Sequence, residues 1–175
     1  MIALLSGKIG VGKTTICQRV LALARKRGYR CGGLLTPAIF DQDGNKIGIK
    51  ALDPLSGQSW TLARTDQAID ELQMGRYHFE TRALQRCLAA IDHAAKECDL
   101  LLIDEIGPLE LEQRRGLAPA LDILPHTPRV LVVVRLALLD KLLAYLGGVE
   151  VAVFTATEEN RETLPDRIVA WLFSS

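Results

Sequence analysis

The sequence has no net charge and no long apolar run. Its 175 residues contain 21 Lys and Arg against 21 Asp and Glu, so the formal charge at pH 7 is zero. This balance does not favour a strongly electrostatic partner such as duplex DNA, although a local basic groove stays open. The most apolar window, residues 130–139, is interrupted by Arg135 and falls short of the ~18 apolar residues of a membrane span. We therefore expect no nucleic acid partner and no membrane association.

The sequence also lacks paired cysteines. Cys17, Cys31, Cys87 and Cys98 form no Cys-x-x-Cys pair, and no cysteine–histidine cluster has zinc-finger spacing. The N-terminus has no basic side chain ahead of a long apolar segment, which a signal peptide requires. We expect four free thiols and a cytoplasmic protein.

Internal repeats, low-complexity tracts and linkers are absent too. The chain is close to the prior of ~150 residues for one domain. Its 49% of apolar and 24% of charged residues are ordinary values for a globular protein. We expect residues 1–175 to form a single domain.

Short apolar runs alternate with longer segments of helical periodicity along most of the chain. Such alternation is typical of a mostly parallel sheet with helices on both faces. The expected parallel strands are Ile2–Ser6, Asp99–Asp104, Arg129–Val134 and Val149–Phe154. The expected helices are Thr14–Lys26, Thr81–Lys96, Glu112–Leu124, Leu136–Leu146 and Glu158–Trp171, the last capped by Thr157. The sequence thus predicts a three-layer α/β fold.

Residues 32–64 depart from this pattern. Strand-like segments at Leu34–Phe40, Lys46–Leu52 and Ser59–Ala63 are separated by turns rich in Asp, Gly, Asn and Pro. Those turn residues favour an antiparallel hairpin insertion at about 32–64. Residues 65–80 are polar, and we assign no element to them.

The strongest motif is Gly7-Lys8-Ile9-Gly10-Val11-Gly12-Lys13-Thr14, followed by Thr15. It matches the phosphate-loop pattern and lies between an expected strand and an expected helix, which is the context that supports the motif. The glycines permit a backbone whose N–H groups point inward at an anion, and the helix adds its positive dipole end. The segment 7–15 therefore predicts binding of a nucleoside triphosphate such as ATP or GTP.

Two side chains of this motif carry specific expectations. Lys13 can reach β- and γ-phosphate oxygens as a mobile positive charge. The Thr14 hydroxyl is placed to ligate Mg²⁺. Lys8 either helps to neutralise the phosphates or is a solvated loop lysine.

An apolar run at residues 100–103 ends in Asp104 and Glu105, which is the Walker B pattern. Ligands of open α/β sheets bind outside the carboxyl ends of the strands. We expect Asp104 to support Mg²⁺ through a water ligand. We expect Glu105 to orient or deprotonate the attacking water.

Arginines beyond two of the strands are candidates for stabilising the transition state of phosphoryl transfer. Arg135 follows one strand, and its alternative is a solvent-exposed position at a helix start. Arg161 follows the last strand, and with Asn160 it either forms a helix-cap pairing or lines the base pocket. Arg76 beside Tyr77 is a further candidate for approaching the nucleotide.

Several segments together carry a family resemblance: Gly10-Val11-Gly12-Lys13-Thr14-Thr15, Gly75-Arg76-Tyr77, Phe79-Glu80, Ile103-Asp104-Glu105-Ile106-Gly107 with Leu109-Glu110-Leu111, and Glu159-Asn160-Arg161. Over most of its length the chain resembles the THEP1-like nucleoside-triphosphatase family, which includes the cancer-related nucleoside triphosphatase. The resemblance implies a RecA-like phosphate-loop domain that hydrolyses nucleoside triphosphates with Mg²⁺ and with broad base tolerance.

The resemblance also implies roles for individual residues. It assigns phosphate binding to residues 7–15, metal binding to Thr14 and Asp104, and water activation to Glu105. The chain departs from the family where Gly107-Pro108-Leu109-Glu110 replaces Gly-Lys-Met-Glu, and where Thr36-Pro37-Ala38-Ile39-Phe40 is apolar rather than charged. We expect the surface facing the substrate to differ accordingly.

Three functions compete at this point. The Asp-Glu pair favours a Mg²⁺-dependent triphosphatase, because water as nucleophile needs a base. A small-molecule or nucleoside phosphotransferase would form its acceptor site from the hairpins at 32–64 or the segment 65–80, but no lid of clustered arginines is evident. A nucleotide-dependent switch is the third, and a Ras-type GTPase is disfavoured because Asn/Thr-Lys-x-Asp is missing. We take hydrolysis of ATP, GTP and other nucleoside triphosphates as the prediction.

Overall fold

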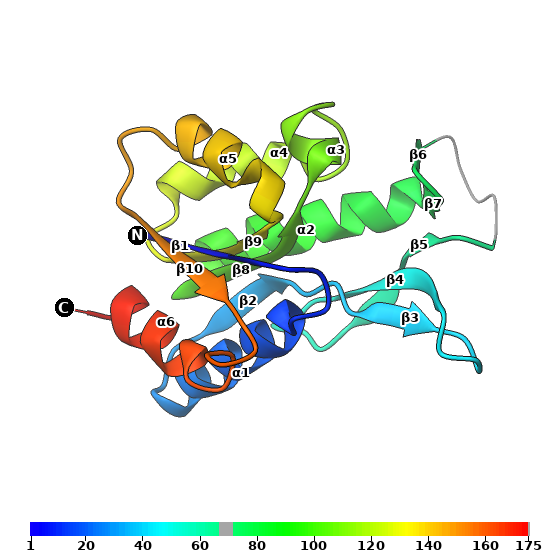
Figure 1. Cartoon of the computed structure of the whole chain (residues 1–175). Coiled ribbons are helices and arrows are strands. Elements are labelled where there is room, and N and C mark those ends of the chain that lie inside the picture. Colours follow the sequence, from blue (N-terminus) through cyan, green and yellow to red (C-terminus); the bar gives the residue numbers. More distant parts are fainter. Residues whose placement is uncertain (67–71, 175) are drawn as a thin grey trace.

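The computed structural model describes residues 1–66 and 72–174, and within them the strands form two five-stranded sheets (Figure 1). The parallel sheet has the order β10-β1-β9-β8-β2. Its strands are β1 (Ile2–Gly7), β2 (Cys31–Leu34), β8 (Leu100–Ile106), β9 (Val130–Val134) and β10 (Val151–Ala156). The antiparallel sheet has the order β3-β4-β5-β7-β6. Its strands are β3 (Ala38–Phe40), β4 (Lys46–Leu52), β5 (Ser59–Arg64), β6 (Leu72–Met74) and β7 (Tyr77–Phe79).

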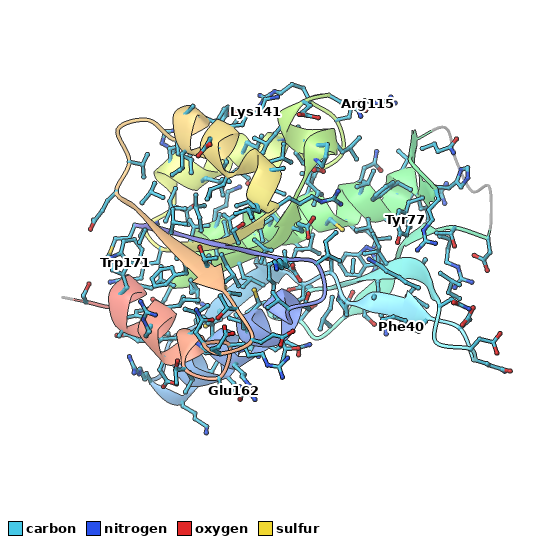
Figure 2. All side chains as sticks on the ribbon, in the orientation of Figure 1. Phe40, Tyr77, Arg115, Lys141, Glu162 and Trp171 are labelled. Carbon is cyan, nitrogen blue, oxygen red and sulfur yellow. The ribbon has the colours of Figure 1, made fainter. Side chains whose placement is uncertain are left out.

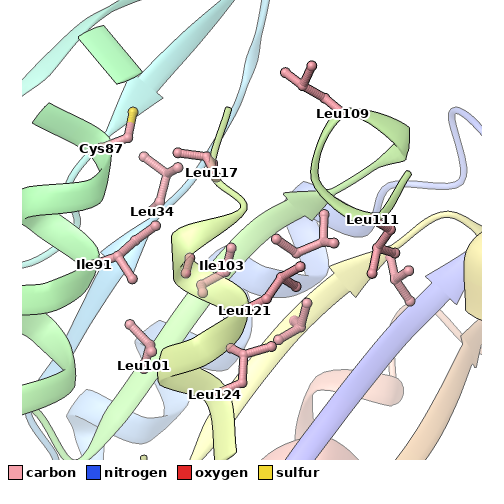
Figure 3. Close-up of a cluster of buried hydrophobic side chains, with 14 of the residues drawn as sticks. Leu34, Cys87, Ile91, Leu101, Ile103, Leu109, Leu111, Leu117, Leu121 and Leu124 are labelled. Carbon is pink, nitrogen blue, oxygen red and sulfur yellow. The ribbon is translucent and has the colours of Figure 1, made fainter. Parts of the chain in front are cut away.

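Helices cover both faces of the parallel sheet. One face carries α1 (Lys13–Lys26) and α6 (Leu164–Leu172). The other carries α2 (Thr81–Glu97), α4 (Pro119–Ile123) and α5 (Leu139–Tyr145). Successive strand residues alternate between the two cores, so that Ile2 and Leu4 face α2 and α4 while Ala3 and Leu5 face α1 and α6. Figure 3 shows the first of these cores. The expected three-layer α/β fold is confirmed.

The topology brings two distant segments of the chain to one edge. The parallel strands β1 and β8 have a single strand, β9, between them. The phosphate-loop segment leaves the carboxyl end of β1, and Asp104 and Glu105 lie at the carboxyl end of β8. Because parallel strands end at the same edge, both motifs face the same space.

The antiparallel sheet is packed against the rest of the molecule through α2. Leu62, Ala63 and Phe79 belong to the same buried core as Leu84 of α2. Trp60 anchors this packing, because its indole N–H donates to the carbonyl oxygen of Ala83 at 3.2 Å. The second sheet thus has a fixed position beside the edge where β1 and β8 end (Figure 1).

The boundaries of the expected insertion at 32–64 are wrong. The segment predicted as one strand, Leu34–Phe40, is divided: β2 pairs parallel with β8 in the central sheet, and β3 begins the antiparallel sheet. A Cβ at Gly33, whose φ is +115°, would lie 2.0 Å from the carbonyl oxygen of Leu102. Glycine is therefore needed for β2 to lie beside β8, and it also interrupts the apolar pattern that would have identified a parallel strand.

The antiparallel sheet also extends past residue 64, to Phe79. Strands β6 and β7 lie in the segment 65–80 to which the sequence assigned no element. Residues 67–71 of that segment lie outside the described residues.

The predicted helix Glu112–Leu124 is wrong as a continuous element. The structure has the short helix α3 (Pro108–Leu111), a loop, α4, and the 3-10 helix η1 (Leu124–His126). Gly116 adopts φ +59° within the loop, and Pro119 starts α4. A left-handed residue ends a helix, and Pro119, three residues later, is tolerated only in the first turn of the next helix, although apolar residues keep helical spacing across both.

The last two predicted helices begin late. The segment predicted at Leu136–Leu146 starts as the 3-10 helix η2 (Leu136–Leu138) and becomes α-helical only from residue 139. Helix α6 begins at Leu164 with Thr163 at its N-cap, so the predicted cap at Thr157 is wrong. Pro165 in the first turn explains the start, because a proline is tolerated there and not further inside.

The four cysteines, all described, are free thiols, as expected. Burial is the main cause that raises the pKa of Cys31 to about 11 and that of Cys87 to about 12. Among the described residues, no helix has both the length and the apolar character that a bilayer crossing demands.

Candidate active site

The phosphate loop connects β1 to α1 as an open cradle. Gly10 and Gly12 have φ of +81° and +96°, and a Cβ on either would meet no protein atom within 4 Å. Glycine is therefore required at these two positions by the backbone conformation rather than by crowding. Gly7 differs, because a Cβ there would lie 2.7 Å from the carbonyl oxygen of Ala156. The loop combines left-handed turns with the N-terminus of a 14-residue helix, which is the arrangement that binds anions through backbone N–H groups.

Lys13 holds its ammonium group at this loop. Its Nζ donates to the carbonyl oxygens of Gly7 and Lys8, at 3.0 Å each. An ammonium has three protons, so one donor remains for a phosphate oxygen while the loop fixes the position of the charge. Lys8 is exposed, and its backbone carbonyl oxygen accepts the hydrogen bond from Lys13.

Thr14 and Asp104 lie in direct contact, although 90 positions separate them in the sequence. The Thr14 hydroxyl donates to Oδ2 of Asp104 at 3.0 Å, and the Thr36 N–H donates to the same oxygen at 3.3 Å. A hydroxyl and a carboxylate are hard oxygen donors of the kind that Mg²⁺ prefers. Within the described residues, no three His, Cys, Asp or Glu side chains gather as a metal cluster. The pair therefore fits Mg²⁺ that is held by few protein ligands and by substrate phosphates.

Asp104 is almost fully buried, with 2% of its surface exposed. Burial is the largest influence and raises the pKa of Asp104 to about 6, whereas the hydrogen bonds from Thr36 and Thr14 lower it. Glu105 raises this pKa further, and Lys13 lowers it. A buried carboxylate with an elevated pKa gains from a nearby cation, which again favours a metal at this position.

Glu105 and Arg135 form an ion pair at the same edge. Arg135 Nε donates to Glu105 Oε1 at 2.6 Å. Glu105 is a bulge residue, because Asp104 pairs with Val133 and Ile106 with Val134 of β9. The bulge directs Glu105 and Asp104 differently, as strand irregularities near sites often do. Arg135 stands at the N-cap of η2 with a half-exposed side chain, as the alternative expected, and from there it also contacts Glu105.

A single cavity of about 450 Å³ joins these groups. Its lining includes Lys13, Thr14, Asp104, Glu105 and Arg135. The structure therefore brings together the predicted phosphate, metal and water-activating positions around one space. This convergence is what a site for phosphoryl transfer requires.

Known proteins share this architecture. A family model described as NTPase matches residues 2–169. The chain belongs to the NTPase family. The chain is 32% identical over 169 residues to the nucleoside-triphosphatase THEP1 of Methanopyrus kandleri, and the matched region covers 94% of this chain and 91% of that protein. It is 31% identical over 168 residues to the THEP1 of Thermofilum pendens, with the same two coverages. The expected resemblance is confirmed, and this NTPase is an enzyme of the nucleoside-triphosphate hydrolase class.

Two solved structures share the fold. The solution structure of a human cancer-related nucleoside triphosphatase has a TM-score of 0.77 and 27% identity, and covers 99% of this chain and 97% of that one. The crystal structure of THEP1 from Aquifex aeolicus has a TM-score of 0.77 and 21% identity, and covers 99% and 100%. The phosphate-loop NTPase fold expected from the sequence is confirmed.

Asn160 and Arg161 lie apart from the carboxylates of this NTPase. Asn160 Oδ1 accepts the N–H of Thr157 at 2.9 Å, and Thr157 Oγ1 accepts the N–H of Asn160 at 3.3 Å. Asn160 therefore forms a reciprocal turn ahead of α6. Arg161 lines a smaller cavity of about 90 Å³ with Thr15 and Arg19, beside the first turn of α1.

Arg76 belongs to the antiparallel sheet instead. Its guanidinium donates to the carbonyl oxygen of Lys46 at 3.1 Å and lies 5.5 Å from the ring centroid of Tyr77. These contacts hold the turn between β6 and β7 in place. Arg76 therefore has a structural role in this turn. It is not among the residues that line the cavity at the phosphate loop.

Sequence reasoning named Glu110 only within the family resemblance and assigned it no role. Its carboxylate is buried and accepts the N–H of Gly107 at 3.0 Å and the N–H of Leu117 at 3.1 Å. It thereby ties the loop that follows Asp104 and Glu105 to α3. A Glu three residues after Gly107 has the spacing of a helix N-terminal capping residue, and this spacing was the available signal.

Proposed function

We propose that this NTPase hydrolyses ATP, GTP and other nucleoside triphosphates to the diphosphate and phosphate, with Mg²⁺ as cofactor. The observation that carries the proposal is the contact of Thr14 with Asp104 inside the cavity that also holds Lys13 and Glu105. Thr14 and Asp104 would hold Mg²⁺, which supplies neutralisation of phosphate charge when bound.

The protein side chains have separable roles in this proposal. Backbone N–H groups of residues 7–15 bind the phosphates, and Lys13 places its charge at the β- and γ-oxygens. Glu105 accepts a hydrogen bond from the attacking water and receives its proton as the oxygen approaches phosphorus. Arg135 fixes the Glu105 carboxylate through Oε1 and brings positive charge to the γ-phosphate, where negative charge spreads in the transition state.

The smaller cavity supports a position for the nucleoside. Arg161 and Thr15 line it, next to the turn that Asn160 organises. The α-phosphate lies toward Thr15 when the γ-phosphate lies toward Asp104, so the base extends toward Arg161. Contacts of this kind favour any nucleotide through its phosphates and sugar, which agrees with broad base tolerance.

The test is phosphate release from ATP, GTP, CTP and UTP with Mg²⁺ and no added acceptor. Glu105→Gln keeps the size of the side chain and removes the base, so we expect hydrolysis to fall by about 10²–10⁴-fold with nucleotide binding retained. Glu112→Gln is the matched control, because Glu112 is exposed and pairs with Lys141 outside the cavity lining. Unimpaired turnover of Glu105→Gln with tight binding would remove Glu105 from the mechanism.

A further inference from the structure

The cavity at the phosphate loop has a second, apolar half. Beyond Glu105 its lining passes to side chains from β3, β4, β5, β7 and α2. We call this half the apolar chamber; it is lined by Ala38, Phe40, Ile49, Leu62, Phe79 and Leu84. The chamber is therefore built mainly by the antiparallel sheet, and the reactive end of the cavity by the parallel sheet.

Hydrolysis alone does not need this chamber. A bound water is held by two to four polar partners, and Asp104, Glu105 and Arg135 already offer such groups in the lining, to which β4 adds the charged side chain of Lys46. Glu110, which also lines the cavity, has both carboxylate oxygens occupied by N–H groups of Gly107 and Leu117. An apolar wall that faces a few polar groups is typical of sites for small organic molecules.

In the proposed function the nucleoside lies at the smaller cavity and leaves the apolar chamber free. The phosphate loop fixes the direction of the triphosphate, with Lys13 and Thr14 at its γ end and Thr15 toward its α end. Thr15, Arg19 and Arg161 line the smaller cavity beside the loop between β10 and α6. Figure 2 shows Phe40, at the chamber, and Glu162, at that loop, on different sides of the phosphate loop. The chamber thus adjoins Glu105, the group that faces the attacking nucleophile in the proposed function.

Exposed apolar side chains mark the mouth of the chamber. Phe40 is 61% exposed and Ile9, at the tip of the phosphate loop, is 97% exposed. Both line the same cavity, one from each sheet region. Single exposed apolar residues need no explanation, but a pair that faces one cavity is what an apolar ligand would cover.

We propose that the apolar chamber binds a small organic alcohol and that the enzyme transfers the γ-phosphoryl group to it. The apolar body of the alcohol lies against Ile49 and Leu62, and its hydroxyl points at Glu105. This inference rests on the proposed function, because it uses the same bound triphosphate and the same base. It adds a second substrate of defined chemistry, in competition with water.

The transfer step balances without a further reactant. The hydroxyl oxygen of the alcohol forms a bond to the γ-phosphorus, and the bond between that phosphorus and the oxygen bridging to the β-phosphate breaks. The hydroxyl proton passes to the Glu105 carboxylate and is later released to solvent. The products are a phosphate monoester of the alcohol and the nucleoside diphosphate.

The experiment follows label from γ-³²P-ATP with Mg²⁺ in the presence of benzyl alcohol, 2-phenylethanol, 1-hexanol or 3-methyl-3-buten-1-ol. Labelled organic phosphate is separated from labelled inorganic phosphate, and binding of each alcohol to the enzyme with a non-hydrolysable ATP analogue is measured by ligand-observed NMR. We expect saturable binding and a labelled monoester from at least one of these alcohols.

Variants of the chamber locate the effect. Ala38→Phe fills the chamber from β3, so we expect the ratio of organic to inorganic phosphate to fall by about tenfold or more. Phe40→Ser removes an exposed ring, which leaves the fold intact, and we expect it to weaken alcohol binding. Thr61→Phe is the control, because Thr61 is exposed on β5 and lies outside the cavity lining.

The outcomes separate the inference from the proposed function. Phosphate release without alcohol, together with no saturable alcohol binding, would overturn the proposal that the chamber binds an alcohol and would leave the proposed hydrolysis intact. Binding without a labelled monoester would overturn the transfer, and alcohol binding as strong in both chamber variants as in the wild type would overturn its location in the chamber. Absence of phosphate release from every nucleotide in the wild type, with or without alcohol, would instead remove the proposed function on which the inference rests.

Discussion

The two sheets contribute opposite kinds of surface to one cavity. The edge of the parallel sheet supplies charge and hydrogen-bonding groups, namely Lys13, Asp104 and Glu105. The antiparallel sheet supplies apolar side chains such as Ile49 and Leu62. Phosphoryl transfer is an electrostatic problem, so its groups lie at strand ends and a helix N-terminus, where the backbone fixes them. Recognition of a second molecule is a problem of shape, and a sheet face can vary for that purpose without moving the charges.

Among substitutions in the part of the cavity that the parallel sheet forms, we expect Lys13→Ala to reduce activity most. Removal of the loop ammonium deprives the β- and γ-phosphates of a fixed charge, so we expect kcat/KM for ATP hydrolysis to fall by about 10³-fold. Steady-state phosphate release checks the result. Lys8→Ala is the comparison, because its side chain is exposed and should cost far less. Wild-type turnover by Lys13→Ala would mean that the phosphate-loop assignment is wrong.

The buried Asp104 makes the same half sensitive to pH in the absence of metal. Its folded pKa of about 6 lies above the ordinary value of 3.8, so between these values the folded state binds more protons than the unfolded state. The free energy of unfolding should therefore decrease as pH rises from about 4 to about 6. A shift of roughly two units corresponds to about 3 kcal/mol.

Urea unfolding without divalent metal, at several pH values, measures this effect. Asp104→Asn should remove the decrease, because the amide does not titrate. Asp43→Asn, in an exposed turn, is the control and should leave it in place. Parallel pH profiles for wild type and Asp104→Asn would show that Asp104 titrates normally.

The two arginines sharpen the distinction between chemistry and nucleotide binding. Arg135 contacts Glu105, so Arg135→Ala should reduce kcat by about 10²-fold. Arg161 lines the smaller cavity, so Arg161→Ala should raise KM and leave kcat nearly unchanged. Kinetics with ATP and GTP resolve the two parameters. An unchanged kcat for Arg135→Ala would exclude it from stabilising the transition state.

Glu110 clamps the segment after β8, and its removal should affect stability rather than chemistry. Glu110→Ala leaves the N–H groups of Gly107 and Leu117 without their buried acceptor, so we expect a loss of about 2 kcal/mol in the free energy of unfolding. Denaturant midpoints measure it. Glu112→Ala, on the exposed side of the same loop, should stay within about 0.5 kcal/mol of the wild type. Equal effects from both substitutions would contradict a clamping role for Glu110.

The half of the cavity that the parallel sheet forms could be predicted because its signals are local. The spacing of Gly7, Gly12 and Lys13 defines the phosphate loop without any tertiary information. Asp104 and Glu105 are recognisable as two acids directly after a buried strand. The contact between Thr14 and Asp104 follows once β1 and β8 are known to be parallel strands of one sheet, with only β9 between them.

The apolar half could not be predicted, because its residues have no local signature. Leu62, Phe79 and Leu84 have the pattern of ordinary core residues, and nothing in their spacing indicates that they border a cavity. The boundary of the insertion failed for a related reason. Gly33 adapts β2 to the carbonyl of Leu102, a requirement set by a strand almost seventy residues away.

The sequence by itself therefore determined the phosphate loop, the acidic strand end and the layered α/β class, since each depends on the order of neighbouring residues. Only the tertiary structure decided which distant side chains share the cavity and that Arg135 contacts Glu105. It also decided that Glu110 holds the segment between Gly107 and Leu117 in place. The physical reason is that a backbone conformation is encoded over a few residues, whereas a cavity is the space that packing leaves between elements far apart in the chain.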